Sequence, residues 1–281
     1  MTGAGSGVGL HVGIGLVREG ARLVAICRNA RRAAETADHI RLQTGSNNVM
    51  AYAADLSVQR EVKAVGEEIR NYFGRVDVLI NDAGCVASEF ELTSDGIERV
   101  LAVNHLAPFL LTHCLLPAIK KSPEGRIINV SSRAHSRGTM HFDDLFLRKN
   151  FSLTRSYDQS KLCNMLFTYY LADKLKASGI TVNVFHPALV NTPFGAKGVS
   201  TFHKWIWQTV SKLGRSASDA AEDGVYLALS NEVAGITGKY FHNKKQIKSS
   251  VGSHNSEWQQ KLWDISLQLT KLRADEYGEI S

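Results

Sequence analysis

Short apolar runs alternate with longer amphipathic segments along most of the chain. This alternation predicts strand–helix–strand units and a mainly parallel sheet. Strands are expected at 22–27, 49–53, 76–80, 126–130, 180–185 and 239–241. Helices are expected at 8–19, 30–42, 57–73, 94–119, 157–177, 218–229 and 257–272. The last of these belongs to the C-terminal segment 254–272. The pattern therefore predicts a doubly wound α/β fold, in which ligands collect at the carboxyl ends of the strands.

The composition supports a single globular domain spanning 1–281. The chain is 44% hydrophobic and 21% charged, and no linker, repeat or low-complexity tract divides it. The segment 191–212 differs from the rest, because aromatic residues from Phe194 to Trp207 cluster in it. These aromatics are interpreted as a wall for a lipophilic substrate, as core packing, or as a membrane-facing patch.

Charge and cysteine usage exclude several classes of protein. The net charge of +6 is spread along the chain, which does not indicate a nucleic-acid surface. The four cysteines are far apart, which argues against a zinc site or a disulfide framework and favours a reducing compartment. No apolar run reaches the ~18 residues of a membrane span, and no signal peptide is recognised. We expect a cytoplasmic or peripherally membrane-associated protein; the sequence leaves a homodimer open.

A tyrosine and a lysine, Tyr157 and Lys161, lie four positions apart on an expected helix. That spacing places both side chains on one helix face. An ammonium group beside a phenol favours the phenolate, so we expect a lowered tyrosine pKa and acid–base chemistry near neutral pH. The same spacing also arises by chance on amphipathic helices, so the pair needs support from other motifs.

A glycine-rich turn from Thr2 to Gly9 leads into the first expected helix. Glycines allow backbone N–H groups to approach a diphosphate, and a helix N-terminus favours negative charge. The spacing is not the GxGxxG fingerprint, and a flexible chain start is the alternative interpretation.

Taken together, these motifs resemble those of the short-chain dehydrogenase/reductase family over nearly the whole chain. The supporting segments are Thr2-Gly3-x-x-x-Gly7-x-Gly9, Asn81-Asp82-Ala83-Gly84, Asn104, Ser132, Tyr157-x-x-x-Lys161 and His186-Pro187-Ala188. Longer phrases, such as Val103-Asn104-His105-Leu106 and Ser160-Lys161-Leu162-Cys163-Asn164, resemble the retinol dehydrogenase branch.

The resemblance implies a catalytic set of Asn104, Ser132, Tyr157 and Lys161. Tyr157 would exchange a proton with the substrate oxygen, Lys161 would lower its pKa and hold the ribose, and Ser132 would bond the substrate oxygen. Asn104 would open its helix to a water that links Lys161 to solvent. Ser132 is preferred to Ser131 because the family's serine matches the second of the pair. The cofactor-binding residues implied are Gly3, Ser6, Gly7, Val8, Arg28, Asp55, Leu56, Asn81, Ala83, Gly84, Tyr157, Lys161, Pro187, Val190 and Thr192.

The end of the strand at 22–27 bears on the choice of cofactor. NAD-binding proteins usually place a carboxylate there, whereas an arginine accommodates the 2′-phosphate of NADP. Here Cys27 occupies the acidic position and Arg28 follows. We therefore expect NADP(H) in preference to NAD(H), with no metal, and a lipophilic alcohol or carbonyl compound as substrate. A general carbonyl or steroid reductase is the alternative.

One expected element of this fold is not found in the sequence. The family's first strand would precede Thr2 and lie centrally, between the strands at 22–27 and 76–80. We interpret its absence as a truncated or mis-started sequence. The alternatives are replacement of the strand by another segment, or a catalytically silent binding protein.

Overall fold

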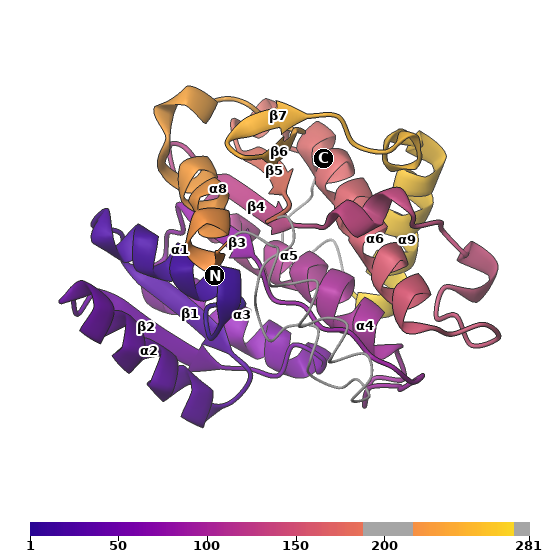
Figure 1. Ribbon diagram of the computed structural model, residues 1–281, viewed down its shortest axis with the longest axis horizontal. Helices are drawn as coiled ribbons and strands as arrows, with labels where there is room; N and C mark the ends of the chain where they lie inside the picture. Colours follow the sequence, from indigo (N-terminus) through magenta and orange to yellow (C-terminus); the bar gives the residue numbers. More distant parts are fainter. Residues whose placement is uncertain (188–215, 273–281) are drawn as a thin grey trace.

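The computed structural model describes residues 1–187 and 216–272, in which helices cover both faces of a mainly parallel sheet (Figure 1). Its strands are β1 (Leu23–Cys27), β2 (Val49–Ala53), β3 (Val78–Asn81), β4 (Arg126–Val130), β5 (Thr181–Phe185), β6 (Tyr240–His242) and β7 (Lys245–Ile247). All six strands expected from the sequence are confirmed to within about two residues at each end. The short β7, whose residues are exposed, was not predicted, because it carries no apolar run.

The strands form two hydrogen-bonded groups. One contains β1 and β2, and the other has the order β3-β4-β5-β6-β7, in which only β6 and β7 are antiparallel. Met1 and Thr2 lie between the two groups: Thr2 bridges Ile26 on one side and Asn81 on the other. The backbone N–H of Thr2 donates to Ile80 O at 3.0 Å, and that of Ile26 donates to Met1 O at 2.8 Å. These two residues therefore join the groups at the position where the sequence analysis expected a central strand.

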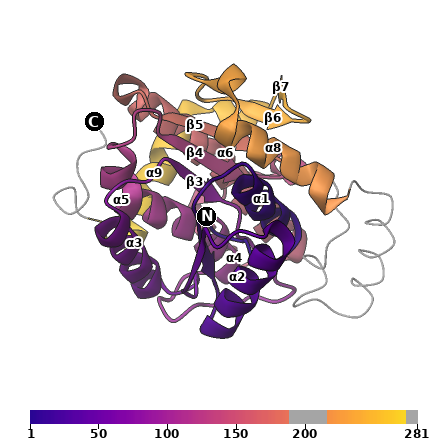
Figure 2. The same ribbon diagram turned by 90° about the vertical axis from the view of Figure 1, so that its left-hand side faces the viewer.

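The helices form a layer on each face of the sheet, as Figures 1 and 2 show. On one face lie α1 (Gly7–Arg18), α2 (Ala30–Thr44) and α8 (Ala217–Leu229), which share an apolar cluster with β1. On the other face lie α3 (Gln59–Phe73), α5 (Ala107–Ile119) and α6 (Leu153–Lys174). The C-terminal helix α9 (Ser256–Thr270) packs outside α6, with Trp263 inserted into the same apolar cluster.

The helix expected at 94–119 begins later and is irregular. It starts as α4 (Arg99–Leu101), because the buried side chain of Glu98 accepts hydrogen bonds from the N–H groups of Val100 and Leu101 and so caps this end. A π-helical turn, Ala102–Leu106, separates α4 from α5. Pro108 has no N–H, so the carbonyl of Asn104 lacks its usual donor four residues on, which favours the wider turn.

The helix α6 begins four residues before the expected Tyr157. Ser152 caps it, since its side chain accepts from the N–H of Arg155 at 3.2 Å. Consequently Tyr157 and Lys161 lie in the second and third turns, inside the regular part of the helix. This helix packs against β5 and against the loop that follows β4, which carries Ser131 and Ser132.

Candidate active site

Tyr157 and Lys161 project from the same face of α6, as their spacing requires. The Nζ of Lys161 lies 5.6 Å from the centroid of the Tyr157 ring. Lys161 is buried, and its Nζ donates to the carbonyl of Val130 at 3.2 Å. The lysine is therefore fixed at the carboxyl end of β4, beside the tyrosine.

The two serines after β4 have different partners. The hydroxyl of Ser131 is buried and donates to the backbone carbonyl of Lys161 at 2.8 Å. Ser132 is half-buried and forms a side-chain hydrogen bond with Tyr157, which favours ionisation of the phenol. Ser132 Oγ also accepts from Ala134 N at 3.2 Å. Ser132 is thus the serine that contacts the tyrosine, whereas Ser131 holds the backbone of α6.

The electrostatics of Tyr157 differ from the sequence expectation. Burial, together with the nearby carboxylate of Asp158, raises the pKa of Tyr157 to about 12, although the hydrogen bond from Ser132 opposes this rise. The expected lowering of this pKa by Lys161 is therefore wrong for this structure, since desolvation of the phenol outweighs it. At neutral pH Tyr157 is a protonated donor.

The ammonium group of Lys161 is weakened by its own surroundings. Burial lowers the pKa of Lys161 to about 8, partly offset by the carboxylate of Asp82. Burial in turn raises the pKa of Asp82 to about 7, and Lys161 opposes that shift. Both groups therefore titrate near neutral pH.

Asn104 lies in the π-turn and is held by backbone groups. Its Oδ1 accepts from Cys85 N at 2.7 Å, and its Nδ2 donates to Cys85 O at 3.0 Å. The Nδ2 also donates to Ser160 Oγ at 3.0 Å, next to Lys161 on α6. Asn104 thus ties the loop after β3 to α6; its expected link to solvent through a water stays a prediction.

The glycine-rich turn packs directly on Asp82. A Cβ atom at Gly3, where φ is +78°, would lie 2.5 Å from Asp82 Oδ2, and one at Gly9 would lie 2.3 Å from the same atom. The hydroxyl oxygen of Thr2 accepts from the N–H groups of Asp82 and Ala83, both at 3.1 Å. Only glycine therefore allows the turn to lie against the end of β3.

The N-terminus of α1 suits a diphosphate. Ser6 precedes Gly7 in an extended conformation and makes no side-chain cap, and the first turn of α1 contains no acidic residue. Ser6 is exposed, while Val8 and Gly9 are buried behind it. The first N–H groups of α1 thus face a position where an anion would be stabilised.

The carboxyl ends of β1 and β2 carry the residues expected at the adenosine end. Arg28 is 64% exposed, and its Nε lies 3.4 Å from Asp55 Oδ2. Cys27 is buried and its Sγ lies 3.5 Å from Thr36 Oγ1. Leu56, next to Asp55, packs at the edge of the apolar cluster. Arg28 is therefore exposed at the end of β1, where its neighbour in the strand is the thiol of Cys27 and not a carboxylate. Its positive charge is partly neutralised by Asp55.

The remaining cofactor-binding candidates have different environments. The side chain of Asn81 is buried and donates to Asn129 Oδ1 at 2.9 Å and to Thr112 Oγ1 at 3.3 Å, so it faces the core. Ala83, Gly84 and Pro187 are half-buried after β3 and β5. Val190, Thr192 and the aromatic segment from Phe194 to Trp207 lie outside the described residues.

Comparison with known proteins agrees with this geometry. The family model "short chain dehydrogenase" matches residues 1–201. The chain belongs to the short-chain dehydrogenase family. It is 36% identical to human retinol dehydrogenase 13 and 34% identical to bovine retinol dehydrogenase 12, covering 99% and 97% of this chain and 86% of each relative. The chain is therefore an oxidoreductase of this family and is similar to retinol dehydrogenases.

Solved structures support the same assignment. A protein of unassigned function from Mycobacterium paratuberculosis is 28% identical, with a TM-score of 0.76 over 97% of this chain and 92% of that one. A 3-ketoacyl-(acyl-carrier-protein) reductase from Brucella melitensis, complexed with NADH, is 26% identical with a TM-score of 0.66, over 85% and 93% of the two chains. The short-chain dehydrogenase fold is thus present over the described residues.

Two residues that contact the site were given no role in it by the sequence analysis: Cys85 and Asn164. Cys85 acts through its backbone, which no side-chain pattern reveals. Asn164 lies one turn beyond Lys161 and donates to the same carbonyl of Val130 at 3.2 Å. Its signal in the sequence is a polar residue three positions after the lysine, among the apolar residues of a buried helix face.

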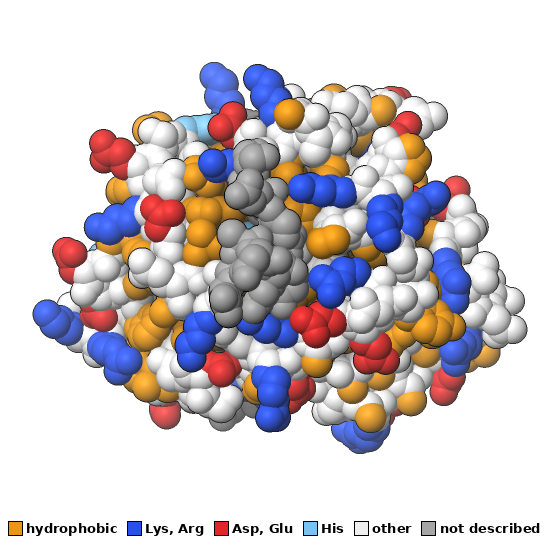
Figure 3. Space-filling view, turned by 180° about the vertical axis from the view of Figure 1, so that it is seen from behind, with side chains coloured by type: hydrophobic (Ala, Val, Ile, Leu, Met, Phe, Trp, Pro, Cys, Tyr) orange, Lys and Arg blue, Asp and Glu red, His pale blue; other side chains and the backbone are white. Residues whose placement is uncertain are grey.

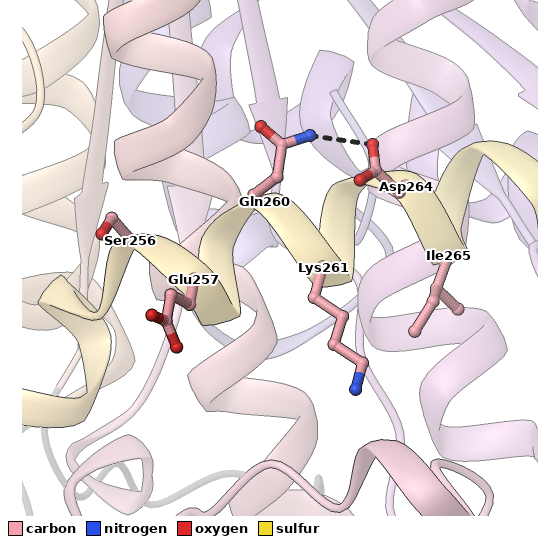
Figure 4. A pocket seen from close by; sticks show the side chains of 6 residues that line it. All are labelled: Ser256, Glu257, Gln260, Lys261, Asp264 and Ile265. Carbon is pink, nitrogen blue, oxygen red and sulfur yellow. Dashed lines mark hydrogen bonds between the residues drawn. The ribbon is translucent and has the colours of Figure 1, made fainter.

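The molecular surface contains a depression that is distinct from this site. It measures about 510 Å³ and is lined by residues of α9 alone (Figure 4): Ser256, Glu257, Gln260, Lys261, Asp264 and Ile265. Two of these residues, Gln260 and Asp264, are joined along the helix by a hydrogen bond of 2.9 Å. None of the candidate catalytic or cofactor-binding residues lines this depression. We therefore place the candidate active site at the strand ends, where polar groups converge, and not in the depression.

The part of the chain that the structure describes also bears on metal binding, membrane crossing and surface charge. No group of three or more His, Cys, Asp or Glu side chains there is arranged to hold a metal ion. One helical stretch, Arg99–Ile119, is long and apolar enough to cross a membrane, but most of it is buried in the protein. On the face shown in Figure 3, Lys and Arg side chains are scattered among acidic and apolar ones.

Proposed function

We propose that this short-chain dehydrogenase reduces a lipophilic aldehyde or ketone of the retinal class, with NADPH as the cofactor. The observation that carries the proposal is the meeting of Ser132, Tyr157 and Lys161 at the carboxyl end of β4. Similarity to retinol dehydrogenases 12 and 13 supports the substrate class. A general carbonyl or steroid reductase remains the alternative within the same chemistry.

The residues present fit a dinucleotide. Gly3 and Gly9 leave space that a Cβ would fill, and the uncapped N-terminus of α1 favours a diphosphate. Lys161 would hold the ribose hydroxyls, and the exposed Arg28 would pair with a 2′-phosphate. The bound nicotinamide supplies the hydride.

The protein's own groups would manage the proton. Tyr157, protonated at neutral pH, would donate its proton to the carbonyl oxygen, and the Ser132 hydroxyl would stabilise the negative charge developing there. Lys161 would supply positive charge beside the phenol as Tyr157 loses its proton. Because Tyr157 carries its proton at neutral pH, the reductive half-reaction needs no prior change in its protonation state.

The direct test is consumption of NADPH, followed at 340 nm, with retinal, medium-chain aldehydes and steroid ketones. We expect turnover with retinal or another lipophilic aldehyde. Failure of every carbonyl compound, with NADPH still quenching tryptophan fluorescence, would contradict the proposal and favour a binding protein.

The pH dependence tests the direction of the reaction. Alcohol oxidation requires the Tyr157 phenolate, whose fraction rises about tenfold per pH unit below the pKa. With that pKa raised to about 12, kcat/KM for oxidation should rise about a hundredfold from pH 6 to pH 8 without a plateau. Reduction requires the phenol and should lack this hundredfold rise, and any smaller change over this range reports Lys161 and Asp82. A plateau in the oxidation profile below pH 8 would contradict a strongly raised pKa.

Arg28 tests the cofactor preference. Arg28→Ala should raise KM for NADPH about tenfold and change KM for NADH less than twofold, because one ionic contact with the 2′-phosphate is worth about 1.4 kcal/mol. Arg41→Ala provides the matched control, since Arg41 lies half-buried at the other end of α2, where it pairs with Asp38 and donates to Val49 O. An equal change for both cofactors in Arg28→Ala would show that this arginine does not read the 2′-phosphate.

A further inference from the structure

One imidazole connects the loop that carries Ser132 with the segment that leads into α9. His135 lies in the short 3₁₀ turn Arg133–Ser136, directly after Ser132, and its side chain is buried. Its Nδ1 lies 2.6 Å from Ser132 O, and its Nε2 accepts from the N–H of Ser250 at 3.2 Å. We propose that His135 is a positioning residue, which fixes Ser132 in the active site through these two hydrogen bonds. The proposal rests on the proposed function only where turnover is measured.

Hydrogen-bond accounting decides which nitrogen of this ring carries the proton. A backbone N–H can only donate, so the bond from Ser250 requires a bare Nε2 on His135. The proton of the neutral ring must then be on Nδ1, which donates to Ser132 O. Burial lowers the pKa of His135, although the bond to Ser132 opposes that shift, so the ring is neutral at neutral pH. Ser250 therefore selects the tautomer that can donate to Ser132.

The orientation of the ring is also determined by its neighbours. If the ring were turned over about the Cβ–Cγ bond, Cδ2 would face Ser132 and Cε1 would face Ser250, and both hydrogen bonds would be lost. Tyr240 of β6 packs edge-on against the imidazole, with ring centroids 5.1 Å apart. The hydroxyl of Tyr240 is fixed in turn, because it lies 2.6 Å from His186 Nδ1. The imidazole is therefore held by β6 as well as by the segment before α9.

The carbonyl oxygen of Ser132 receives two hydrogen bonds from His135. Besides Nδ1, the backbone N–H of His135 donates to this oxygen at 3.1 Å and closes the 3₁₀ turn. A carbonyl oxygen has two lone pairs, and both are used here. The Ser132 hydroxyl also accepts from the N–H of Ala134 in the same turn. Rotation of the Ser132 backbone would break these bonds, so they hold its hydroxyl at Tyr157.

Ser250 is anchored by its own turn. Its carbonyl oxygen accepts from Ser253 N at 3.1 Å and from Ser253 Oγ at 2.6 Å, and Ser253 is fully buried. The turn leads to Asn255, whose side chain caps α9 by accepting from the N–H of Trp258 at 2.9 Å. His135 therefore connects Ser132 with a turn that is itself hydrogen-bonded and packed.

Two substitutions at His135 separate the two hydrogen bonds. In His135→Asn the side-chain NH₂ group takes the place of Nδ1 and can donate to Ser132 O, whereas Ser250 is out of reach. In His135→Gln the amide oxygen takes the place of Nε2 and can accept from Ser250, whereas Ser132 O loses its side-chain donor. His135→Leu removes both bonds and keeps an apolar side chain in the buried position.

The two amide variants should differ in turnover. We expect His135→Leu and His135→Gln to lower kcat for aldehyde reduction about tenfold, because Ser132 is no longer held in the productive geometry. His135→Asn should keep kcat within about threefold of the wild type, because its amide donates without any choice of tautomer. KM for the aldehyde and NADPH affinity should change less than about twofold in all three variants, since Ser132 acts on the charge developing during the reaction. Wild-type kcat in His135→Leu, or a glutamine that restores kcat as well as asparagine does, would overturn the inference.

A double-mutant cycle shows whether the effect passes through Ser132. Ser132→Ala alone should lower kcat by about 10²-fold or more, as expected for the loss of an oxyanion donor. Adding His135→Leu to Ser132→Ala should cost less than about twofold more, because no hydroxyl remains to be positioned. A further tenfold loss in the double variant would show that His135 acts on the fold in general, which contradicts the proposal.

His113→Leu is the matched control for the loss of a buried histidine. His113 is buried in α5, and its Nδ1 lies 2.7 Å from the backbone carbonyl of Phe109 in the same helix, so its ring also bonds to local backbone. The substitution should lower the thermal midpoint and leave kcat unchanged. If it lowers kcat as much as His135→Leu does, the loss reports general packing and the proposal fails.

NMR of ¹⁵N-labelled histidine tests the bridge without any turnover. We expect the ring of His135, assigned by its absence from the spectrum of His135→Asn, to carry its proton on Nδ1 at neutral pH. A proton on Nε2, or a charged ring, would rule out the bond from Ser250 and overturn the inference. A wild-type protein that reduces no carbonyl compound would overturn the proposed function, while the tautomer of His135 would still decide the bridge.

Discussion

Tyr157→Phe is expected to lower kcat for carbonyl reduction by about 10²- to 10⁴-fold, the usual contribution of a general acid. Phenylalanine keeps the ring beside Lys161 but has no proton to give to the substrate oxygen. Steady-state NADPH oxidation with the best aldehyde of the panel measures the effect. NADPH affinity, measured by fluorescence quenching, should change little, because Lys161 and the glycine-rich turn are unaltered.

Tyr169→Phe is the matched control for this substitution. Tyr169 lies on the same helix, α6, and its hydroxyl donates to Ser249 Oγ at 2.7 Å, away from the catalytic set. It should lose at most a small part of the stability and keep its kcat. Near wild-type turnover in Tyr157→Phe would remove this tyrosine from the mechanism.

Gly9→Ala is expected to destabilise the protein by about 3 kcal/mol, the upper range for an overpacked site. The new Cβ would lie 2.4 Å from the carbonyl oxygen of Gly3 and 2.3 Å from Asp82 Oδ2. The first neighbour is backbone, so the turn itself must move. Urea denaturation should show a lower midpoint, and NADPH binding should weaken because α1 shifts away from the turn.

Gly13→Ala, one turn further along α1, separates this overlap from the general effect of a glycine in a helix. Its Cβ would meet the end of the Leu23 side chain at 3.1 Å, which can give way. Alanine also favours the helix by about 1 kcal/mol. The stability of Gly13→Ala should therefore stay within about 1 kcal/mol of the wild type, and an equal loss in both variants would argue against a special role for Gly9.

Much of the fold was predictable because its signals are local. The apolar runs of β1, β2, β4 and β5 and the amphipathic period of α3 need no tertiary information. The spacing of Tyr157 and Lys161 placed both side chains on one helix face. The predicted start of the helix at Ser94 was wrong, because the helix begins at Arg99. Its cap is the buried carboxylate of Glu98, and glutamate is a residue type that also favours helix interiors.

The electrostatics of the site were not predictable in the same way. A tyrosine pKa depends on how many atoms exclude water from the phenol, and this number comes from β4, α6 and the loops around them together. The charge of Lys161 depends likewise on Asp82, which is distant in the sequence. The sequence identified the reacting groups and gave the wrong direction for the pKa of Tyr157.

The buried contacts of His105 and Asn164 show the limit most clearly. His105 in the π-turn lies 2.8 Å from Ser266 Oγ of α9, and Asn164 on α6 donates to Val130 O of β4. A buried histidine or asparagine has no signature in the sequence that names its partner. The amino-acid sequence by itself determined the doubly wound fold, the placing of Tyr157 and Lys161 on one helix face and the glycine-rich turn, because periodicity and spacing are properties of local geometry. Asn104 and Ser132 followed only from the resemblance to the family. Only the tertiary structure decided which carbonyl receives Lys161, which serine contacts Tyr157, and that α9 contacts the π-turn, because burial and hydrogen-bond pairing depend on segments brought together by folding.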